Sequence, residues 1–119
     1  MYFYDSYAII EHINNKPAYH RFNSFEIITN TLNLCEAHYI LSDLISIEYA
    51  DNAIINLKAT ILQVTKEIAI KASKMRFINK KLKLSYADCI GYACAIENDL
   101  KFLTGDDGMK SFEDVEFVK

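Results

Sequence analysis

The stretch SYADCIGYACAIENDLKFLT, residues 85–104, combines a long apolar segment with a short run of strand-forming residues. The pattern predicts a helix over residues 85–98, followed by a strand over Lys101–Thr104. Asp88 is the only charged residue from Tyr86 to Ile96, so the helix is apolar nearly all round. A helix of that composition is typically buried on most of its sides.

Strands and helices alternate in the same way along the rest of the chain. The pattern predicts strands over residues 2–4, 25–29, 60–64 and 115–118, and helices over residues 6–15, 31–44, 48–58 and 65–78. Pro17 marks a break between the first helix and the second strand. Short strands separated by helices of about a dozen residues imply βαβ units, and therefore an α/β fold whose parallel sheet is covered by helices on both faces.

Length and composition predict one globular domain. The 119 residues leave no room for a second core, so we expect a single domain over residues 1–119. With 51% hydrophobic and 24% charged residues, the chain lies far from the composition of disordered proteins. A net charge of -3 excludes the globally basic surface of non-specific nucleic-acid binders, but it leaves room for a local basic patch.

The cysteines and the N-terminus indicate where the protein works. Cys35, Cys89 and Cys94 form an odd set without C-x-x-C spacing, so they suggest neither a disulfide framework nor a zinc site. We expect them to be small buried hydrophobic residues in a reducing compartment. Residues 1–5 lack the basic region of a signal peptide, and no apolar stretch approaches the roughly 20 residues of a membrane span. We therefore predict a cytoplasmic protein with no membrane partner.

Four acidic residues stand out because of their positions relative to the predicted strands. Asp5 directly ends the first strand, and Asp106 follows the strand over Lys101–Thr104. Glu36 lies about one and a half turns into the second helix, and Asp88 opens the apolar helix. Ligands of open α/β sheets bind at the carboxyl ends of the strands, so these acids are the first candidates for a functional site.

A cluster of these acids predicts a metal site. Neither Glu36 nor Asp88 has a lysine or arginine close to it in sequence. A buried carboxylate without a counter-charge is costly, and four such groups together would repel one another strongly. Carboxylate oxygens without histidine or thiolate suit the hard ions Mg²⁺ or Mn²⁺. Such an ion can align and activate water for attack on a phosphodiester, which makes phosphodiester hydrolysis the expected reaction.

Four segments of the sequence carry a resemblance to a known family. They are YDSYAII at residues 4–10, LCE at 34–36, LSYADCIGYACA at 84–95 and FLTGD at 102–106. In order and spacing they resemble the successive motifs of PIN-domain nucleases, especially the VapC toxins of prokaryotic toxin–antitoxin pairs. The resemblance spans essentially the whole chain. It implies a three-layer α/β/α fold with a central, mostly parallel sheet, Mg²⁺- or Mn²⁺-dependent endoribonuclease activity on RNA, a homodimer, and a partner antitoxin that occupies the active site.

The resemblance also assigns roles to individual residues. It implies that Asp5, Glu36, Asp88 and Asp106 are the catalytic, metal-binding acids, supported by the hydroxyl groups of Thr104 and Ser6. The chain departs from the family at two positions. Family members often have a small polar residue where this chain has Tyr7, which affects the hydrogen bonding around Asp5. Asp107 directly follows Asp106 and could share its role or replace it.

Each acid also has a purely structural interpretation. Ser85-x-x-Asp88 approximates a capping box, in which the carboxylate serves the start of the helix. Asp106-Asp107-Gly108 is by itself most often a turn, and Glu36 could lie exposed on its helix. The nuclease interpretation is preferred because all of these separate explanations would have to hold together.

A run of basic residues, Lys71 to Lys83, contains no acidic residue. The simplest interpretation is a solvated helix face. In the functional interpretation this run contacts an RNA backbone while the acids cut it, and the candidates are Lys74, Arg76, Lys80 and Lys81, with Arg21 as a separate one.

Two other functions are compatible with the sequence. One is a PIN-like domain that binds RNA or a protein without cutting it. The other is a different Mg²⁺-dependent α/β protein, such as a receiver domain or a phosphatase, which also carries an aspartate after its first strand. That last class would place its other key acids on loops at strand ends, whereas Glu36 and Asp88 fall within predicted helices.

Overall fold

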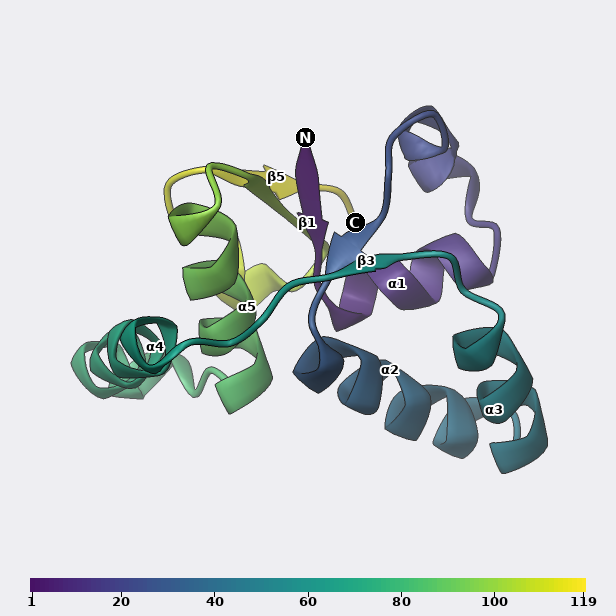
Figure 1. The fold of residues 1–119 in the computed structure, drawn as a ribbon, viewed down its shortest axis with the longest axis horizontal. Coiled ribbons are helices and arrows are strands. Elements are labelled where there is room, and N and C mark those ends of the chain that lie inside the picture. The colour runs from purple at the N-terminus through teal and green to yellow at the C-terminus, as the bar shows by residue number, and fades with distance from the viewer.

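The computed structural model describes all residues from Met1 to Lys119. Its centre is one five-stranded sheet in the order β3-β2-β1-β4-β5, and every neighbouring pair of strands is parallel. The strands are β1 (Tyr2–Tyr4), β2 (Ile28–Thr29), β3 (Thr60–Ile61), β4 (Lys101–Thr104) and β5 (Val115–Phe117). Figure 1 shows helices on both sides of the sheet, so the predicted three-layer α/β/α arrangement is confirmed.

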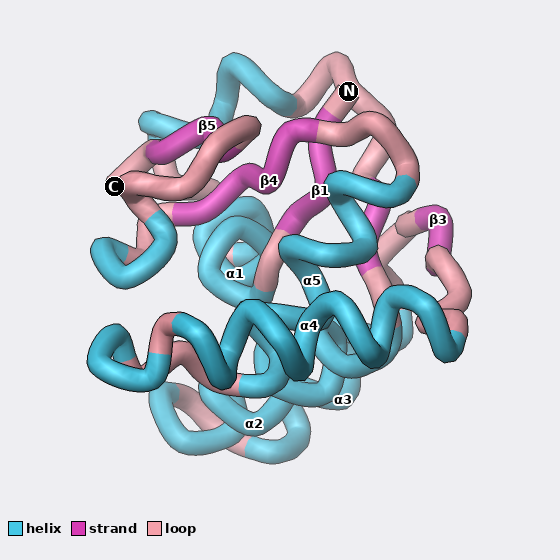
Figure 2. The backbone as a smooth tube through the Cα atoms, turned by 90° about the vertical axis from the view of Figure 1, so that its left-hand side faces the viewer, coloured by secondary structure: helices cyan, strands magenta, loops and turns pink.

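Five α-helices and three short 3₁₀ helices connect the strands. They are α1 (Ser6–Ile13), η1 (Pro17–Phe22), α2 (Thr31–Leu44), α3 (Ile47–Ile55), α4 (Lys66–Ile78), η2 (Lys80–Leu82), α5 (Tyr86–Glu97) and η3 (Asp107–Met109). In Figure 1, α1, α2 and α3 lie on one side of the sheet, and α4 and α5 lie on the other. The backbone tube in Figure 2 shows α4 running in front of α5, against which it packs.

Each α-helix begins at a polar side chain that accepts a hydrogen bond from the first turn. These N-cap residues are Asp5, Asn30, Ser46, Thr65 and Ser85. Such caps satisfy backbone N–H groups that have no partner inside the helix. They explain why the observed helices start at or within one residue of the predicted positions.

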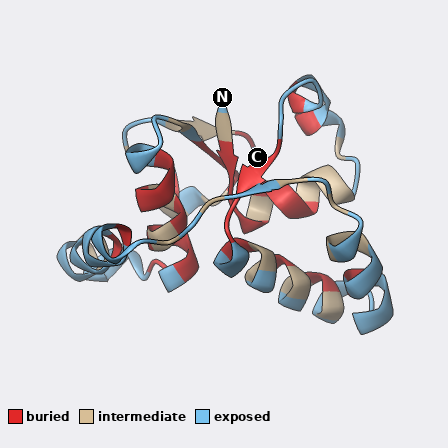
Figure 3. Cartoon of the chain, in the orientation of Figure 1, coloured by how far each residue is buried: buried red, intermediate tan, exposed pale blue.

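The alternation of side chains along β1 and β4 creates two hydrophobic cores. Phe3 and Phe102 are opposite one another in the register and face α4 and α5. Tyr4 and Leu103, one residue further along each strand, belong to the core formed with α1, α2 and α3. Figure 3 shows the burial concentrated in the sheet and on the helix faces that point toward it. The central strands of the sheet are therefore buried on both faces, as is usual for parallel sheets.

Three strands are shorter than the sequence predicts: β5 by one residue, and β2 and β3 by three residues each. The strand expected over residues 25–29 is reduced to Ile28–Thr29, and the one expected over residues 60–64 is reduced to Thr60–Ile61. Phe25 leaves the sheet and packs edge-on against Tyr2, with ring centroids 5.1 Å apart. β3 forms one edge of the sheet, and both of its residues are exposed. Burial of side chains therefore does not stabilise further strand pairing beyond these two residues.

The burial of one cysteine was predicted wrongly. Cys89 and Cys94 are buried in α5 as expected, but Cys35 is exposed. It lies on α2 next to Glu36, on the side of the helix that does not face the core. None of the helices is both long enough and apolar enough to cross a membrane.

A network of buried polar side chains joins the starts of α1 and α2 to α5. The Asn30 side-chain oxygen accepts hydrogen bonds from the backbone and the side-chain amide of Asn33, both at 2.9 Å. The Asn33 side-chain oxygen accepts from the backbone N–H of Ser6 at 3.1 Å, and the Asn30 amide approaches Cys94 Sγ at 3.4 Å. Asn30 and Asn33 are fully buried. The network fixes the position of Ser6, and with it the end of β1.

Gly91 allows α5 to approach this network closely. A Cβ atom at this position would lie 2.8 Å from Asn33 Nδ2 and 3.1 Å from the rings of Phe3 and Phe102. The first distance is too short for a non-bonded contact, and all three neighbours are buried side chains. Only glycine fits without displacing them.

We expect Gly91→Ala to destabilise the protein by about 1–2 kcal/mol, because the cost of overpacking exceeds the gain in helix propensity. The measurement is urea unfolding. Gly108→Ala is the control, since its added methyl group would meet mainly the flexible end of Leu84, at 3.2 Å. Equal stability of the two variants would contradict the close approach described for α5.

Candidate active site

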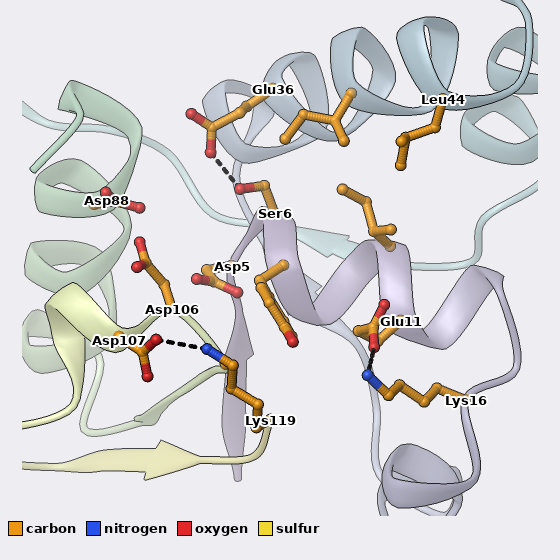
Figure 4. A pocket seen from close by; sticks show the side chains of 14 residues that line it. Asp5, Ser6, Glu11, Lys16, Glu36, Leu44, Asp88, Asp106, Asp107 and Lys119 are labelled. Atoms are coloured by element: carbon orange, nitrogen blue, oxygen red, sulfur yellow. Dashed lines mark hydrogen bonds and ion pairs between the residues drawn. The ribbon is translucent and has the colours of Figure 1, made fainter.

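One pocket lies at the carboxyl ends of β1 and β4 and has a volume of about 550 Å³. All four acids singled out in the sequence line it, namely Asp5, Glu36, Asp88 and Asp106. They come from the end of β1, from α2, from α5 and from the segment after β4. Figure 4 shows their carboxylate groups around the same space. Residues that are far apart in the sequence therefore form a single acidic site.

Asp5 is the most deeply buried of these acids, with 1% of the residue exposed. It caps α1, and its Oδ1 accepts a hydrogen bond from the backbone N–H of Ala8 at 2.9 Å. The pKa of Asp5 is raised to about 7, mainly by burial; hydrogen bonds from Thr104 and Ala8 oppose this rise, and the charges of Asp88 and Asp106 add to it. No basic side chain is among the causes that shift this pKa.

Asp88 serves the start of α5 and also lines the pocket. It is the third residue of a capping box, in which its Oδ2 accepts from the backbone N–H of Ser85 and its own N–H donates to the Ser85 hydroxyl, both at 3.0 Å. It also lines the pocket and is 8% exposed. Burial is the main cause that raises its pKa, and the charges of Asp106 and Glu36 add to the effect.

The structure distinguishes Asp106 from Asp107. Asp106 Oδ1 accepts from the backbone N–H of Gly108 at 3.1 Å, and the Asp106 carboxylate points toward Asp5 and Asp88 in Figure 4. Asp107 is exposed and forms an ion pair of 2.6 Å with Lys119. That ion pair lowers the pKa of Asp107. Asp106 is therefore the better candidate for the fourth acid, and Asp107 lies at the rim.

Two hydroxyl groups hold acids in place. The Ser6 hydroxyl donates a hydrogen bond to Glu36 Oε1, and Thr104 Oγ1 accepts from the backbone N–H of Asp106 at 3.0 Å. Thr104 is fully buried, and its hydroxyl group also helps to lower the pKa of Asp5. Glu36 is only half-buried, rather than buried, and its carboxylate has the neutral Ser6 hydroxyl as a hydrogen-bond partner.

The donor atoms of the pocket suit a hard divalent cation. Asp5, Asp88 and Asp106 offer carboxylate oxygens, and the pKa values of Asp5 and Asp88 are raised mainly by burial and further by the charges of neighbouring acids. As these side chains stand, no group of three or more acidic, histidine or cysteine side chains is arranged to hold a metal ion. The fit therefore lies in the chemistry of the donors, and binding would require their side chains to move inward or water molecules to complete the ligand set.

The basic candidates from the sequence lie elsewhere. None of them lines the acidic pocket; they are Arg21, Lys74, Arg76, Lys80 and Lys81. Arg76 donates to the backbone oxygen of Leu84 at 2.9 Å and stacks over Tyr86, and Lys80 lies over Phe77. Arg21 is 3.7 Å from Glu116. Their role in RNA binding stays a prediction.

The sequence analysis missed three residues that line or support the pocket without being among its acids. Lys16 and Lys119 line it, each paired with an acid, and Asn33 fixes Ser6 from below. The Lys16–Glu11 pair spans five residues at the end of a predicted helix, which is a signal that could have been noticed. The Lys119–Asp107 and Asn33–Ser6 contacts depend on tertiary structure and leave no local pattern.

The raised pKa of Asp5 predicts a dependence of stability on pH. Between about pH 4 and pH 7 the folded state binds this proton more tightly than the unfolded state, so the contribution of Asp5 to stability falls as the pH rises through that range. Asp5→Asn keeps a good N-cap and removes the titration. We expect the free energy of unfolding of Asp5→Asn, minus that of the wild type, to be larger at pH 8 than at pH 5 by about 2–3 kcal/mol.

The measurement is urea unfolding of both proteins at the two pH values, with a chelator present. Asp107→Asn is the control, because Asp107 is exposed and its pKa is lowered rather than raised. A constant difference between Asp5→Asn and the wild type across the pH range would rule out the raised pKa.

Three solved structures share this fold at low sequence identity. Each match covers 98% of this chain. The first is VapC20 of Mycobacterium tuberculosis, described as a toxin that cleaves the sarcin–ricin loop (99% of that chain, 17% identity, TM-score 0.75). The second is a toxin–antitoxin complex from Klebsiella pneumoniae (96% of that chain, 14% identity, TM-score 0.73). The third is VapBC2 from Rickettsia felis bound to a fragment of promoter DNA (96% of that chain, 15% identity, TM-score 0.74).

At these identities the structural likeness establishes the fold. A search among curated proteins gives no match. The sequence itself matches the PIN domain over residues 2–117, which is nearly the whole chain. The chain therefore belongs to the PIN domain family.

Proposed function

We propose that this protein is a metal-dependent endoribonuclease that hydrolyses phosphodiester bonds of RNA. The observation that carries the proposal is the meeting of Asp5, Glu36, Asp88 and Asp106 in one pocket of a PIN-domain fold. Asp5 and Asp88 are buried although ionised carboxylates are costly to bury without a partner. A stable fold tolerates such a site when the acids have a function that needs them together.

In this proposal Asp5, Asp88 and Asp106 hold a Mg²⁺ or Mn²⁺ ion, with Glu36 as the fourth acid. The ion, when bound, supplies positive charge that attracts the phosphodiester and favours deprotonation of the attacking water. Ser6 orients Glu36 through its hydrogen bond, so that the second carboxylate oxygen of Glu36 is left to orient the water. Thr104 supports both Asp5 and Asp106 from the buried side of the pocket.

The biological role proposed here is that of the toxin of a VapBC-type pair. The similar structures include a toxin described as cleaving an RNA loop and two toxin–antitoxin assemblies. By analogy, residues 1–119 act as a single nuclease domain in the cytoplasm. The expected partners are an RNA substrate, a cognate antitoxin and a second copy of the chain in a homodimer.

A second candidate is a PIN domain that binds RNA or a protein without cutting. It is favoured by one observation, namely that the acids of the described pocket do not form a ready-made set of metal ligands. The receiver and phosphatase alternatives have no such support. Glu36 and Asp88 lie within α2 and α5, and the chain matches the PIN family.

We expect Asp5→Asn, Asp88→Asn and Asp106→Asn each to lower RNA cleavage by about 100-fold or more, because each removes a proposed ligand of the metal while keeping the shape of the side chain. Cleavage of a fluorogenic single-stranded RNA in Mg²⁺ or Mn²⁺ is the measurement. A chelator should abolish the activity of the wild type.

Asp107→Asn is the matched control, since it changes the neighbouring aspartate and should retain cleavage within about threefold of the wild type. Full activity of Asp5→Asn and Asp88→Asn would exclude the proposed mechanism. Binding of RNA by the wild type without cleavage in either metal would favour the non-catalytic alternative. A large loss of cleavage in Asp107→Asn, with Asp106→Asn still active, would show that Asp107 rather than Asp106 is the fourth acid.

A further inference from the structure

Lys16 and Lys119 are the only basic residues that line the acidic pocket. Lys16 lies between α1 and η1, and Lys119 follows β5. Each ammonium group pairs with a carboxylate outside the set of four proposed catalytic acids. Lys16 Nζ is 2.6 Å from Glu11 Oε2, and Lys119 Nζ is 2.6 Å from Asp107 Oδ2 (Figure 4). The two lysines therefore belong to the site but not to its proposed catalytic group.

The remainder of the pocket is strongly acidic. Its acidic lining residues are Asp5, Glu11, Glu36, Asp88, Asp106 and Asp107. An RNA backbone carries one negative charge per phosphate, so it is repelled by this lining wherever no cation faces it. The basic run on α4 and η2 does not line the pocket and cannot neutralise phosphates inside it. The substrate contacts within the pocket must then come from the cations already there.

On the basis of the proposed nuclease function, we infer that Lys16 and Lys119 bind two phosphates of a single RNA strand, both on the same side of the phosphate to be cut. Lys119 lies beside Asp107, next to Asp106, and binds the phosphate nearer the acids. Lys16 lies beyond the far end of α1 and binds a phosphate further along the strand. The two residues act as positioning residues for the substrate.

The environment of Lys119 allows it to exchange its partner. The side chains of Lys119 and Asp107 are 61% and 70% exposed. Solvent screens an ion pair of this kind, so breaking it costs little. When a phosphate replaces Asp107, the ammonium group keeps an anionic partner and counterions are released from the RNA. Asp107 holds the lysine near the pocket while no substrate is bound.

The environment of Lys16 is more restricted. Glu11 has only 16% of its side chain exposed, and it holds the ammonium group against the wall of the pocket. Glu11 follows Asp5 by six residues along α1, which corresponds to about 9 Å of helix axis. Lys16 is therefore held near the end of α1, whereas Lys119 pairs with Asp107 next to Asp106, so the two lysines have different partners on different segments of the pocket wall.

The test uses Asp5→Asn protein, which is not expected to cut RNA, and a fluorescently labelled single-stranded RNA in Mg²⁺. Fluorescence anisotropy gives Kd over a series of salt concentrations. We expect Lys16→Gln and Lys119→Gln in this background each to raise Kd about fivefold, and to reduce the slope of log Kd against log salt by about 0.7, the value for one phosphate contact on a single strand. In the Asp5-containing protein, each change should raise KM while kcat stays within about twofold.

Lys66→Gln is the charge-matched control, because Lys66 is exposed at the start of α4 and does not line the pocket. Salt slopes of the Lys16 and Lys119 variants equal to that of Lys66→Gln would overturn the inference. A loss of RNA affinity confined to Lys74→Gln would also overturn it, because it would show that the basic run binds the substrate instead. A fall in kcat at unchanged KM would also overturn it. Cleavage by the wild type is scored separately, so failure of the nuclease proposal is distinguishable from failure of this one.

Discussion

The buried carboxyl group of Asp5 is the constraint around which the rest of the site is arranged. β1 is the central strand of the sheet, and its last residue is followed by an acid that has 1% of its surface exposed. No basic side chain compensates it, and its hydrogen bonds come from Ala8 and Thr104. The fold tolerates this group because it also caps α1. The approach of Asp106 to it follows from the same parallel sheet, which brings strand ends to one edge, and Asp88 reaches the same pocket from the start of α5.

Much of this arrangement could be predicted because the relevant signals are local. The observed bounds of α2 and β4 equal the predicted ones, since periodicity and a capping asparagine define the helix, and a short apolar run defines the strand. Asp5 and Asp106 could be assigned to one site because both follow strands of a parallel sheet. Glu36 and Asp88 lie in helices, and they were singled out as isolated charges in largely apolar segments before the family resemblance assigned them the same role.

The parts that could not be predicted depend on tertiary structure. The choice between Asp106 and Asp107 rests on which carboxylate turns inward, and that is decided by the hydrogen bond to Gly108 and the ion pair with Lys119. The network of Asn30 and Asn33 joins segments that have no sequence relationship to one another. The length of β3 depends on its exposed position at the edge of the sheet, which its β-branched residues do not reveal.

The double use of three acids as helix caps has a consequence for genetics. Asp5 caps α1, Asp88 closes the capping box of α5, and Asp106 caps η3. Under the proposed toxin function, a selection for bacterial colonies that survive expression of this protein would recover changes at these codons for two unrelated reasons. Some survivors would carry a folded protein without activity, and others a chain degraded before it could act. Substitutions that keep a capping side chain, such as asparagine, should leave the protein folded, so the amount of protein in each colony would separate the two classes.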